Sequence, residues 1–310
     1  MRYDDFRRSD NIDDRRDDGG MGGGGGGFGF PMGGGGLGIG TVIVLGLIGW
    51  AVGIDPRILI SGAEILGGGA PSYQTDGRNP PRSSKTGAPQ DEMGSFVAGV
   101  LGEIDDRWDE IFNAAGQRYS GPRIVLFRNA TNGGRCGMAQ SAMGPFYCPP
   151  DKQIYLDTAF FREIETRFRG CSGKACKFTQ AYIIAHEAGH HVQNLLGILP
   201  RVTQMQQQAG SRAESNALQV KVELQADCLA GVWANRELKK RPGFIEAGDI
   251  DAALQTAAAI GDDTLQRQAQ GRVVPDSFTH GSAEQRKRWF MTGFQQGTLQ
   301  ACNTFAAARL

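Results

Sequence analysis

The histidines are the feature of this sequence that most constrains its fold, because three of the four in the chain fall within residues 186–191. The stretch from His186 to His190 reads HEAGH, which is the pattern H-E-x-x-H. Residues four apart lie on one face of an α-helix, so two imidazoles at this spacing can bind a single zinc ion. Glu187 follows the first histidine and can accept a proton from a water molecule on that ion. The pattern therefore predicts a helix that carries part of a zinc site.

The neighbours of the motif are consistent with a buried helix. His191 points about 100° away from His190 around the helix, so we expect it to pack against or support the site and not to share the metal. The alternative is that the histidines are structural residues of an amphipathic helix. Against it stand the apolar residues that supply a buried face: Ile183, Ile184, Val192, Leu195 and Leu196.

A catalytic zinc site needs a third protein ligand and one position open to water. The longer motif that takes a third histidine from the same helix is absent, because Gln193 and Leu196 stand where its glycine and histidine would be. A glutamate from a later helix is the remaining source of a ligand. Three glutamates are candidates: Glu214, Glu223 and Glu237.

Glu223 is favoured among these candidates because Asp227 follows it by one helical turn, within the apolar stretch VELQADCLAG. At that spacing Glu223 can bind zinc while Asp227 accepts a hydrogen bond from His186 and fixes the tautomer of that imidazole. A solvated pair of helical acids is the alternative, and the apolar neighbours argue against it.

The last histidine, His280, lies in the stretch DSFTHGSAEQR. Near the site, its imidazole could stabilise the oxyanion of a tetrahedral intermediate, with Arg286 holding substrate or structure. The alternative is that His280 only precedes a helix whose N-cap is Ser282.

The first ninety residues differ in composition from the rest of the chain. Residues 1–36 join a mixed-charge segment to a glycine-rich one, and both are expected to be disordered because they bury too little apolar surface. Residues 37–54 contain no charge and are just long enough to span a bilayer as one helix. A buried globular helix and a cleavable signal peptide are the alternatives. Residues 55–90 are rich in Gly, Pro and Ser and are expected to form a linker.

All the cysteines lie beyond the apolar segment, and none forms a C-x-x-C pair, which argues against a zinc ribbon. Disulfides in an oxidising compartment fit this distribution, with the N-terminus in the cytoplasm and the following domain in the periplasm or outside the cell. Buried reduced thiols are the alternative. The cysteines are Cys136, Cys148, Cys171, Cys176, Cys228 and Cys302. The 33 basic and 33 acidic residues cancel, so nothing indicates a nucleic-acid partner.

The folded part is expected to begin at Asp91 and to form one domain over residues 91–310. Apolar residues recur at helical spacing from Phe96 to Phe112, and strand-like runs follow at residues 123–127 and 153–157. The later sequence is helical in pattern. A small strand layer followed by a mostly helical core predicts an α+β fold.

The motifs together resemble the glutamate-ligand zinc peptidases, called gluzincins, and more closely the bacterial membrane-anchored family named "putative neutral zinc metallopeptidase". The resemblance implies a zincin-like catalytic domain, peptidase activity and one zinc ion per chain. It is carried by SDNIDDRR, the apolar segment, MGPFYCPPDKQIYLD, YIIAHEAGHHVQNLLGI, ELQADCLAGVWA and GRVVPDSFTHGSAEQRKRWF.

A second resemblance concerns the end of the chain. The pattern T-H-G-x-x-x-Q-R is similar to the T-H-P-x-x-x-x-R element of the heat-shock and CAAX-prenyl type membrane peptidases, in which the histidine and arginine lie near the cleft. This similarity supports roles for His280 and Arg286 at the site. Gly281 stands where that element has proline, which leaves the local turn open.

The family resemblance also implies three disulfides and a substrate-binding strand. The implied pairs are Cys136 with Cys148, Cys171 with Cys176, and Cys228 with Cys302. In peptidases of this kind an edge strand ahead of the zinc helix often pairs with extended substrate, so QIYLD (residues 153–157) is the expected peptide-binding edge.

These features predict a single-pass, membrane-anchored zinc metalloendopeptidase that cleaves peptides or unfolded proteins, with zinc held by His186, His190 and Glu223. Glu187 is expected to activate the water and then to pass its proton to the leaving amine. The alternative is a non-catalytic zinc-binding envelope scaffold or chaperone-like protein, which would have no need of a general base. The sequence makes no prediction of oligomeric state.

Overall fold

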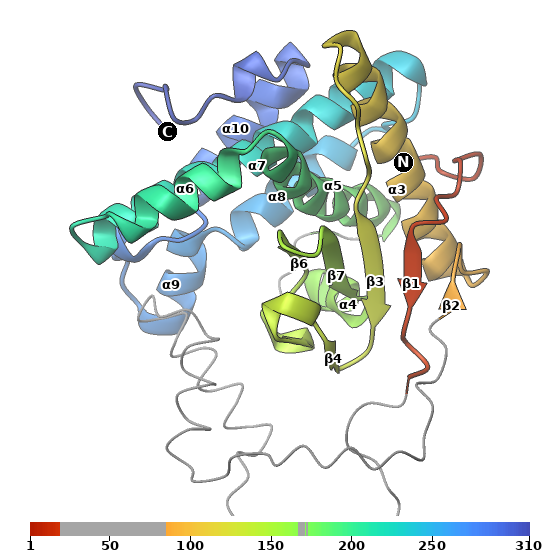
Figure 1. Cartoon of the computed structure of the whole chain (residues 1–310), viewed down its shortest axis with the longest axis horizontal. Helices are drawn as coiled ribbons and strands as arrows, with labels where there is room; N and C mark the ends of the chain where they lie inside the picture. The colour runs from red at the N-terminus through yellow and green to blue at the C-terminus, as the bar shows by residue number, and fades with distance from the viewer. Residues whose placement is uncertain (19–84, 167–170, 172) are drawn as a thin grey trace, which may run out of the picture.

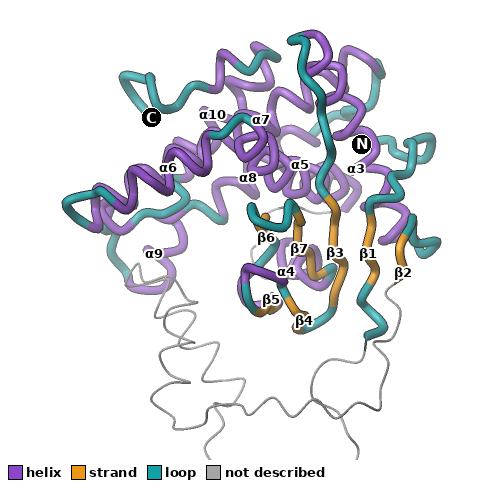
Figure 2. Tube along the Cα trace, viewed as in Figure 1, coloured by secondary structure: helices purple, strands orange, loops and turns teal. Residues whose placement is uncertain are grey.

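The computed structural model describes residues 1–18, 85–166, 171 and 173–310, and in this part of the chain a small sheet packs against a larger group of helices (Figure 1). The strands gather on one side of the molecule, below the crossing helices (Figure 2). The expectation of a mixed α+β fold is confirmed.

The main sheet has five strands in the order β2-β1-β3-β7-β6. The three inner strands are parallel, and the two outer strands pair antiparallel to their neighbours. The apolar run of β3 is buried from Ile124 to Phe127, as expected of a strand covered on both faces. The strands are β1 (Ile12–Asp14), β2 (Lys85–Thr86), β3 (Arg123–Phe127), β6 (Phe146–Cys148) and β7 (Gln153–Asp157).

The position of β7 corrects one expectation. The QIYLD strand is not an edge, because β7 pairs with β3 on one side and with β6 on the other. The edge on this side of the sheet, among the described residues, is β6. The error has a physical cause: a strand-like run shows that a strand forms, but not how many neighbours it acquires.

Helices form the other layer and supply most of the core. The first, α3 (Glu92–Ala114), begins at Asp91, whose side chain accepts a hydrogen bond from the backbone N–H of Gly94. It buries the helical-spaced apolar residues that predicted it, and Gly116 follows its end with a φ of 71°. The remaining long helices are α5 (Cys176–Leu195), α7 (Arg212–Lys240), α8 (Asp249–Ala259) and α10 (Ala283–Gln296).

Shorter elements connect or flank these two layers. Two strands form a separate small hairpin, and α6 extends away from the sheet (Figures 1 and 2). Their bounds are β4 (Ala130–Asn132), β5 (Met138–Gln140), α4 (Ala159–Thr166), α6 (Ile198–Gln207) and α9 (Asp262–Gln270).

The N-terminal residues give a second correction. Residues 1–18, expected to be part of a disordered tail over 1–36, carry β1, and Ile12 is completely buried. The mixed charges do not remain solvated, because Arg15 pairs with Asp13 at 2.6 Å and Arg16 with Asp14 at 2.6 Å. The mixed charges predicted a segment that buries too little apolar surface to fold. In the structure these charges form ion pairs with one another. In the same way β2 falls within the expected linker over residues 55–90.

This pairing also bears on topology. β1 and β3 are hydrogen-bonded neighbours, so residues 1–18 and the strands that follow residue 85 contribute to one sheet. The expected membrane helix, residues 37–54, lies outside the described residues. Within the part that the structure describes, no helix is both long and apolar enough to cross a membrane.

The six cysteines form the three expected disulfides. Their Cα atoms lie 6.0 Å apart for Cys136–Cys148, 5.1 Å for Cys171–Cys176 and 5.5 Å for Cys228–Cys302. The last pair fastens the C-terminal segment to α7. The pairing implied by the family resemblance is therefore confirmed, and the alternative of reduced thiols does not describe this structure.

Candidate metal centre

Two crossing helices, α5 and α7, build the candidate site. The H-E-x-x-H motif lies on α5, and Gly189 within it faces α7 closely: a Cβ there would stand 3.0 Å from the carbonyl oxygen of Ala226. A side chain larger than hydrogen would push the helices apart. This contact brings the acidic side chains of α7 against the two histidines of α5.

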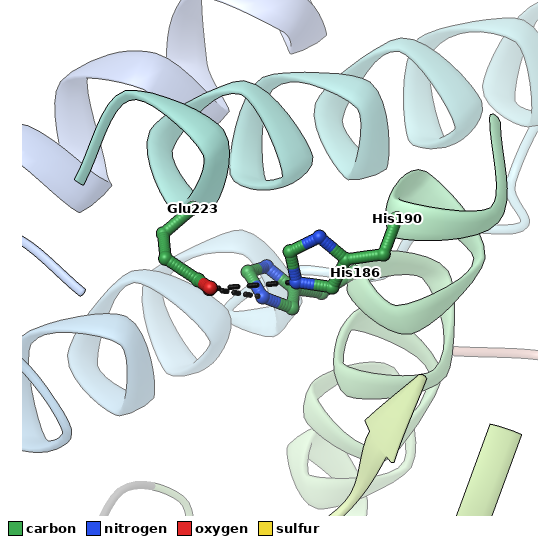
Figure 3. A group of neighbouring side chains, drawn as sticks. All are labelled: His186, His190 and Glu223. Carbon is green, nitrogen blue, oxygen red and sulfur yellow. Dashed lines mark hydrogen bonds and ion pairs between the residues drawn. The ribbon is translucent and has the colours of Figure 1, made fainter. Parts of the chain in front are cut away.

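Three side chains converge at the crossing (Figure 3). One carboxylate oxygen of Glu223, Oε2, lies 3.2 Å from Nε2 of His186 and 3.4 Å from Nε2 of His190. One ligand atom from each of the three residues lies within 4.8 Å of the others. Bonds of about 2.0–2.1 Å around a tetrahedral zinc ion place neighbouring ligand atoms about 3.3–3.4 Å apart. The two nitrogen–oxygen separations therefore match those of a zinc site, and two nitrogens with one oxygen suit zinc in chemistry.

His186 is held from its far side by a buried network. Its Nδ1 lies 2.8 Å from Oδ1 of Asp227, which also accepts a hydrogen bond from the hydroxyl of Tyr182 at 2.6 Å. Arg286 donates to both oxygens of Asp227, at 2.8 and 3.0 Å, and to the Tyr182 hydroxyl at 3.2 Å. The predicted contact between His186 and Asp227 is present.

Arg286 thus holds structure, which is one of the two roles that the sequence left open. Its side chain is almost fully buried and reaches the site only through Asp227 and Tyr182. The tyrosine was not anticipated. A signal was present, because Tyr182 precedes His186 by four residues and so shares its face of the helix.

Two glutamines complete the support of the ligands, and sequence reasoning missed both. Nδ1 of His190 lies 2.9 Å from Oε1 of Gln193. The second oxygen of Glu223, Oε1, accepts a hydrogen bond from Nε2 of Gln219 at 2.8 Å. Each glutamine follows or precedes its ligand by three or four residues, so helical spacing was again the available signal.

Burial and opposite charges shift the pKa values of the site in opposing directions. Burial disfavours ionisation of Glu223, yet the adjacent His190 and His186 hold its pKa well below the usual range. Burial also disfavours a charged His186, but Asp227 and Glu223 raise the pKa of this imidazole to about 10. Burial raises the pKa of Glu187, against the influence of both histidines. The raised pKa suits a group that must accept and then release a proton.

His280 lies close enough to the centre for its charge to lower the pKa values of Glu187 and Glu223. Asp262 positions the loop that carries His280. Its Oδ2 accepts hydrogen bonds from the backbone N–H groups of Thr279 at 2.7 Å, His280 at 2.6 Å and Gly281 at 2.9 Å. The other oxygen of Asp262 lies 3.4 Å from Nδ1 of His280. No sequence pattern connected Asp262 to the site, because it comes from α9.

The glycine at position 281 is required by this turn. Gly281 has a φ of 91° and donates its N–H to Asp262, and proline can do neither. Ser282 then caps α10 in a capping box with Gln285. The helix-entry role that the sequence offered as an alternative is therefore present together with the proximity of His280 to the centre.

The other candidates lie away from the centre. His191 is completely buried, with Nδ1 2.9 Å from the hydroxyl of Tyr147 and Nε2 2.7 Å from the backbone oxygen of Ser120. Glu214 accepts a hydrogen bond from the N–H of Gly210, and Glu237 pairs with Arg241. These contacts agree with the expectation that His191 does not share the metal, and they leave Glu223 as the glutamate at the centre.

A buried H-E-x-x-H helix crossed by a helix that brings a glutamate to both histidines defines a class of protein with the layout of a zinc peptidase. A family model described as "Putative neutral zinc metallopeptidase" matches residues 1–305, and the chain belongs to this family.

Relatives from two bacteria share much of the sequence. "Uncharacterized protein YpfJ" of Escherichia coli (strain K12) is 43% identical over 309 residues, which cover 98% of this chain and 99% of that protein. "Uncharacterized protein Rv2575" of Mycobacterium tuberculosis (strain ATCC 25618 / H37Rv) is 46% identical over 200 residues, 62% of this chain and 65% of that protein. No solved structure matches the chain.

Proposed function

We propose that this protein is a zinc-dependent metallopeptidase that hydrolyses peptide bonds. The observation that carries the proposal is the convergence of His186 and His190 from α5 on one oxygen of Glu223 from α7, with Glu187 beside the first histidine. His186, His190 and Glu223 would hold one zinc ion per chain. Family membership supports the same reading.

The chemistry divides between the metal and the chain. When bound, zinc lowers the pKa of its water and polarises the scissile carbonyl. Glu187 takes the proton from that water and delivers it to the leaving amine; the buried carboxylate, with its raised pKa, suits both steps. His280, held by Asp262, donates a hydrogen bond to the substrate oxygen as negative charge develops there. Asp227 keeps Nδ1 of His186 protonated, so that the lone pair of Nε2 would be free to bind zinc.

Peptides or unfolded proteins are the proposed substrates. The edge strand β6 replaces QIYLD as the proposed partner of an extended peptide, since β6 pairs on one side only among the described residues. β6 also lies against α5, which carries the two histidines: the Tyr147 hydroxyl of β6 contacts His191 of α5. An extended chain can add to such an edge through backbone hydrogen bonds.

The proposed location is the cell membrane, with residues 37–54 as the attachment and the disulfide-bonded domain in an oxidising compartment. The three disulfides support the compartment. The pairing of β1 with β3 adds one condition, which is that residues 1–18 lie on the same side as the domain.

The first test replaces the proposed base. Glu187→Gln is expected to keep one zinc ion per chain and to lower the hydrolysis of a casein-type substrate by at least about 100-fold, because the amide cannot accept the proton. Zinc is measured by elemental analysis and cleavage with and without a chelator. The matched control is Glu214→Gln on α7, which makes the same chemical change outside the centre. Cleavage by Glu187→Gln at the wild-type rate would contradict the mechanism.

The same measurements decide between enzyme and scaffold. One zinc ion per chain without chelator-sensitive cleavage of any unfolded protein would assign a structural role to the metal. Absence of zinc from Glu187→Gln, in contrast, would show that the substitution disturbs binding and not only proton transfer.

A further inference from the structure

Gln193 lies one helical turn after His190 and is completely buried between α5 and α7. A buried amide must place both its oxygen and its NH₂ group against suitable partners, because leaving a buried polar group unpaired costs free energy. Its neighbours therefore determine which way the amide points.

Those neighbours fix the amide in one orientation. One end of Gln193 lies 2.8 Å from the backbone carbonyl oxygen of Val222 and 3.0 Å from Oε1 of Gln225. The carbonyl only accepts hydrogen bonds, so the atom beside it must be the NH₂ group. Oε1 of Gln193 then faces Nδ1 of His190, at 2.9 Å.

The orientation of Gln193 decides the tautomer of His190. Since Oε1 only accepts, Nδ1 of His190 must carry the proton, which leaves the lone pair of Nε2 facing Glu223. The same tautomer of His186 is set differently, by the charged carboxylate of Asp227. The two histidines therefore have separate supports, one ionic and one neutral.

The hydrogen-bond chain continues to the end of the molecule. Nε2 of Gln225 donates to the backbone oxygen of Cys302 at 2.8 Å, which turns Oε1 of Gln225 toward Gln193. Cys302 is bonded to Cys228, and Thr304 holds the same segment through the carbonyl of Lys221. The acceptor that orients Gln225 is thus itself fastened to α7.

We propose that Gln193, oriented by Val222 and Gln225, is the positioning residue that sets the tautomer of His190 and turns its Nε2 toward the metal. This inference rests on the proposed zinc site and adds to it a neutral support that is anchored at the Cys228–Cys302 disulfide. Outer partners of metal-bound histidines typically contribute about 10- to 100-fold in metal affinity.

The experiment compares two substitutions in the full chain. Gln193→Met removes the acceptor and is expected to weaken zinc binding by about 10- to 100-fold in a chelator competition. In NMR spectra of the zinc-loaded variant, the exchange-protected Nδ1–H resonance of His190 should be absent. Gln193→Glu keeps an acceptor, so it should keep that resonance and bind zinc within about threefold of wild type, although it removes the NH₂ group that lies beside Val222 and Gln225.

A control and a second variant make the test decisive. Gln180→Met changes another buried glutamine of the same helix, one whose Oε1 has no hydrogen-bond partner in the described structure, and should leave zinc affinity unchanged. Cys228→Ser with Cys302→Ser should weaken zinc binding less than Gln193→Met, because Thr304 still holds the segment.

Two outcomes would overturn the inference. One is equal zinc affinity in wild type, Gln193→Met and Gln180→Met. The other is equal loss of zinc and of the Nδ1–H resonance in Gln193→Met and Gln193→Glu, which would mean that the residue only packs. A wild-type protein that binds no zinc would instead overturn the proposed function on which the inference rests.

Discussion

Glu223 illustrates how single atoms define this centre, because its two carboxylate oxygens have different partners. Oε2 faces the histidines, whereas Oε1 accepts a hydrogen bond from Gln219. Gln219 in turn lies 3.2 Å from the side chain of Gln206 on α6. With one oxygen engaged in this way, Glu223 would bind a metal through the other alone and leave a position for water.

Gln219→Leu tests this division of roles. Freeing Oε1 should let Glu223 bind through both oxygens, so the cobalt-substituted protein is expected to show the weaker visible absorption of a higher coordination number. Zinc affinity is expected to change by about tenfold. Gln207→Leu, at an exposed position of α6, is the control. An unaltered cobalt spectrum in Gln219→Leu would show that Gln219 does not restrict the carboxylate.

A second residue-scale prediction concerns Asp105 of α3, which is not part of the centre. Burial raises the pKa of Asp105 to about 7, against the hydrogen bond from Tyr119 and the charge of Arg7. The folded protein therefore binds a proton more tightly at this group than the unfolded chain does. The stability from this group is fully present below pH 4, near the unfolded pKa, and is lost as pH rises through about 7.

Asp105→Asn, which resembles the protonated form, should remove this dependence. Relative to wild type, its free energy of unfolding in urea is expected to improve between pH 5 and pH 8 by about 1–3 kcal/mol. Asp109→Asn, on an exposed turn of the same helix, provides the comparison. A constant difference between Asp105→Asn and wild type across this range would contradict the raised pKa.

Among the elements, α7 and α10 cross at close range near the site. A Cβ on Gly293 would stand 1.8 Å from the carbonyl oxygen of Cys228, and one on Gly231 would stand 2.1 Å from that of Phe290. Each helix thus presents a glycine to the backbone of the other. The contact keeps Arg286 of α10 against Asp227 of α7.

Gly293→Ala should therefore separate the two helices. The expected cost is about 1–3 kcal/mol in the free energy of unfolding, measured in urea, together with weaker zinc binding through the displaced Arg286. Gly210→Ala is the matched substitution at an exposed position, where a Cβ would meet only Glu214 at an ordinary 3.6 Å. Normal stability of Gly293→Ala would mean that the backbones can move apart freely.

Considered as a whole, the molecule closes its sheet with a segment from the start of the chain. β1 lies between β2 and β3, and Gly102 of α3 leaves room for the N-terminal backbone: a Cβ there would stand 1.9 Å from the carbonyl oxygen of Arg7. A protein that begins at residue 91 would lack two strands of the sheet. The boundary expected from composition therefore cuts through the folded domain.

Ile12→Ala measures the contribution of this segment. Ile12 is completely buried in β1, so the substitution should cost about 2–5 kcal/mol in the free energy of unfolding. Asn11→Ala, at the exposed neighbouring position, should cost little. Equal stability of Ile12→Ala and Asn11→Ala would contradict the packing of this segment and favour a disordered tail.

The shared compartment of the two segments can be tested in intact cells. The native cysteines are all paired in the described structure, so a single added cysteine is the only free thiol there. Arg8→Cys and Lys239→Cys place it at exposed positions of the N-terminal segment and of α7. Both variants should react alike with a membrane-impermeant maleimide, and labelling of only one would contradict the pairing of β1 with β3.

The sequence by itself determined the parts of the site that depend on spacing within one helix. His186 and His190 are one turn apart, and so are Glu223 and Asp227, and helical geometry brings each pair to one face wherever the helix lies. The same rule covers Tyr182, Gln193 and Gln219, which share helix faces with the site residues that they support. The expected helices formed for the same local reason.

Only the tertiary structure decided what depends on how elements dock. β7 became an inner strand because β6 folds back on it. Residues 1–18 became ordered because their charges pair with one another and the strand of the buried Ile12 pairs with β3. Asp262 reaches the loop of His280 from another helix. Residues on one face of a helix recur at a fixed spacing in the sequence, so the sequence predicts their contacts. Contacts between separate elements depend on close packing, which has no such spacing in the sequence.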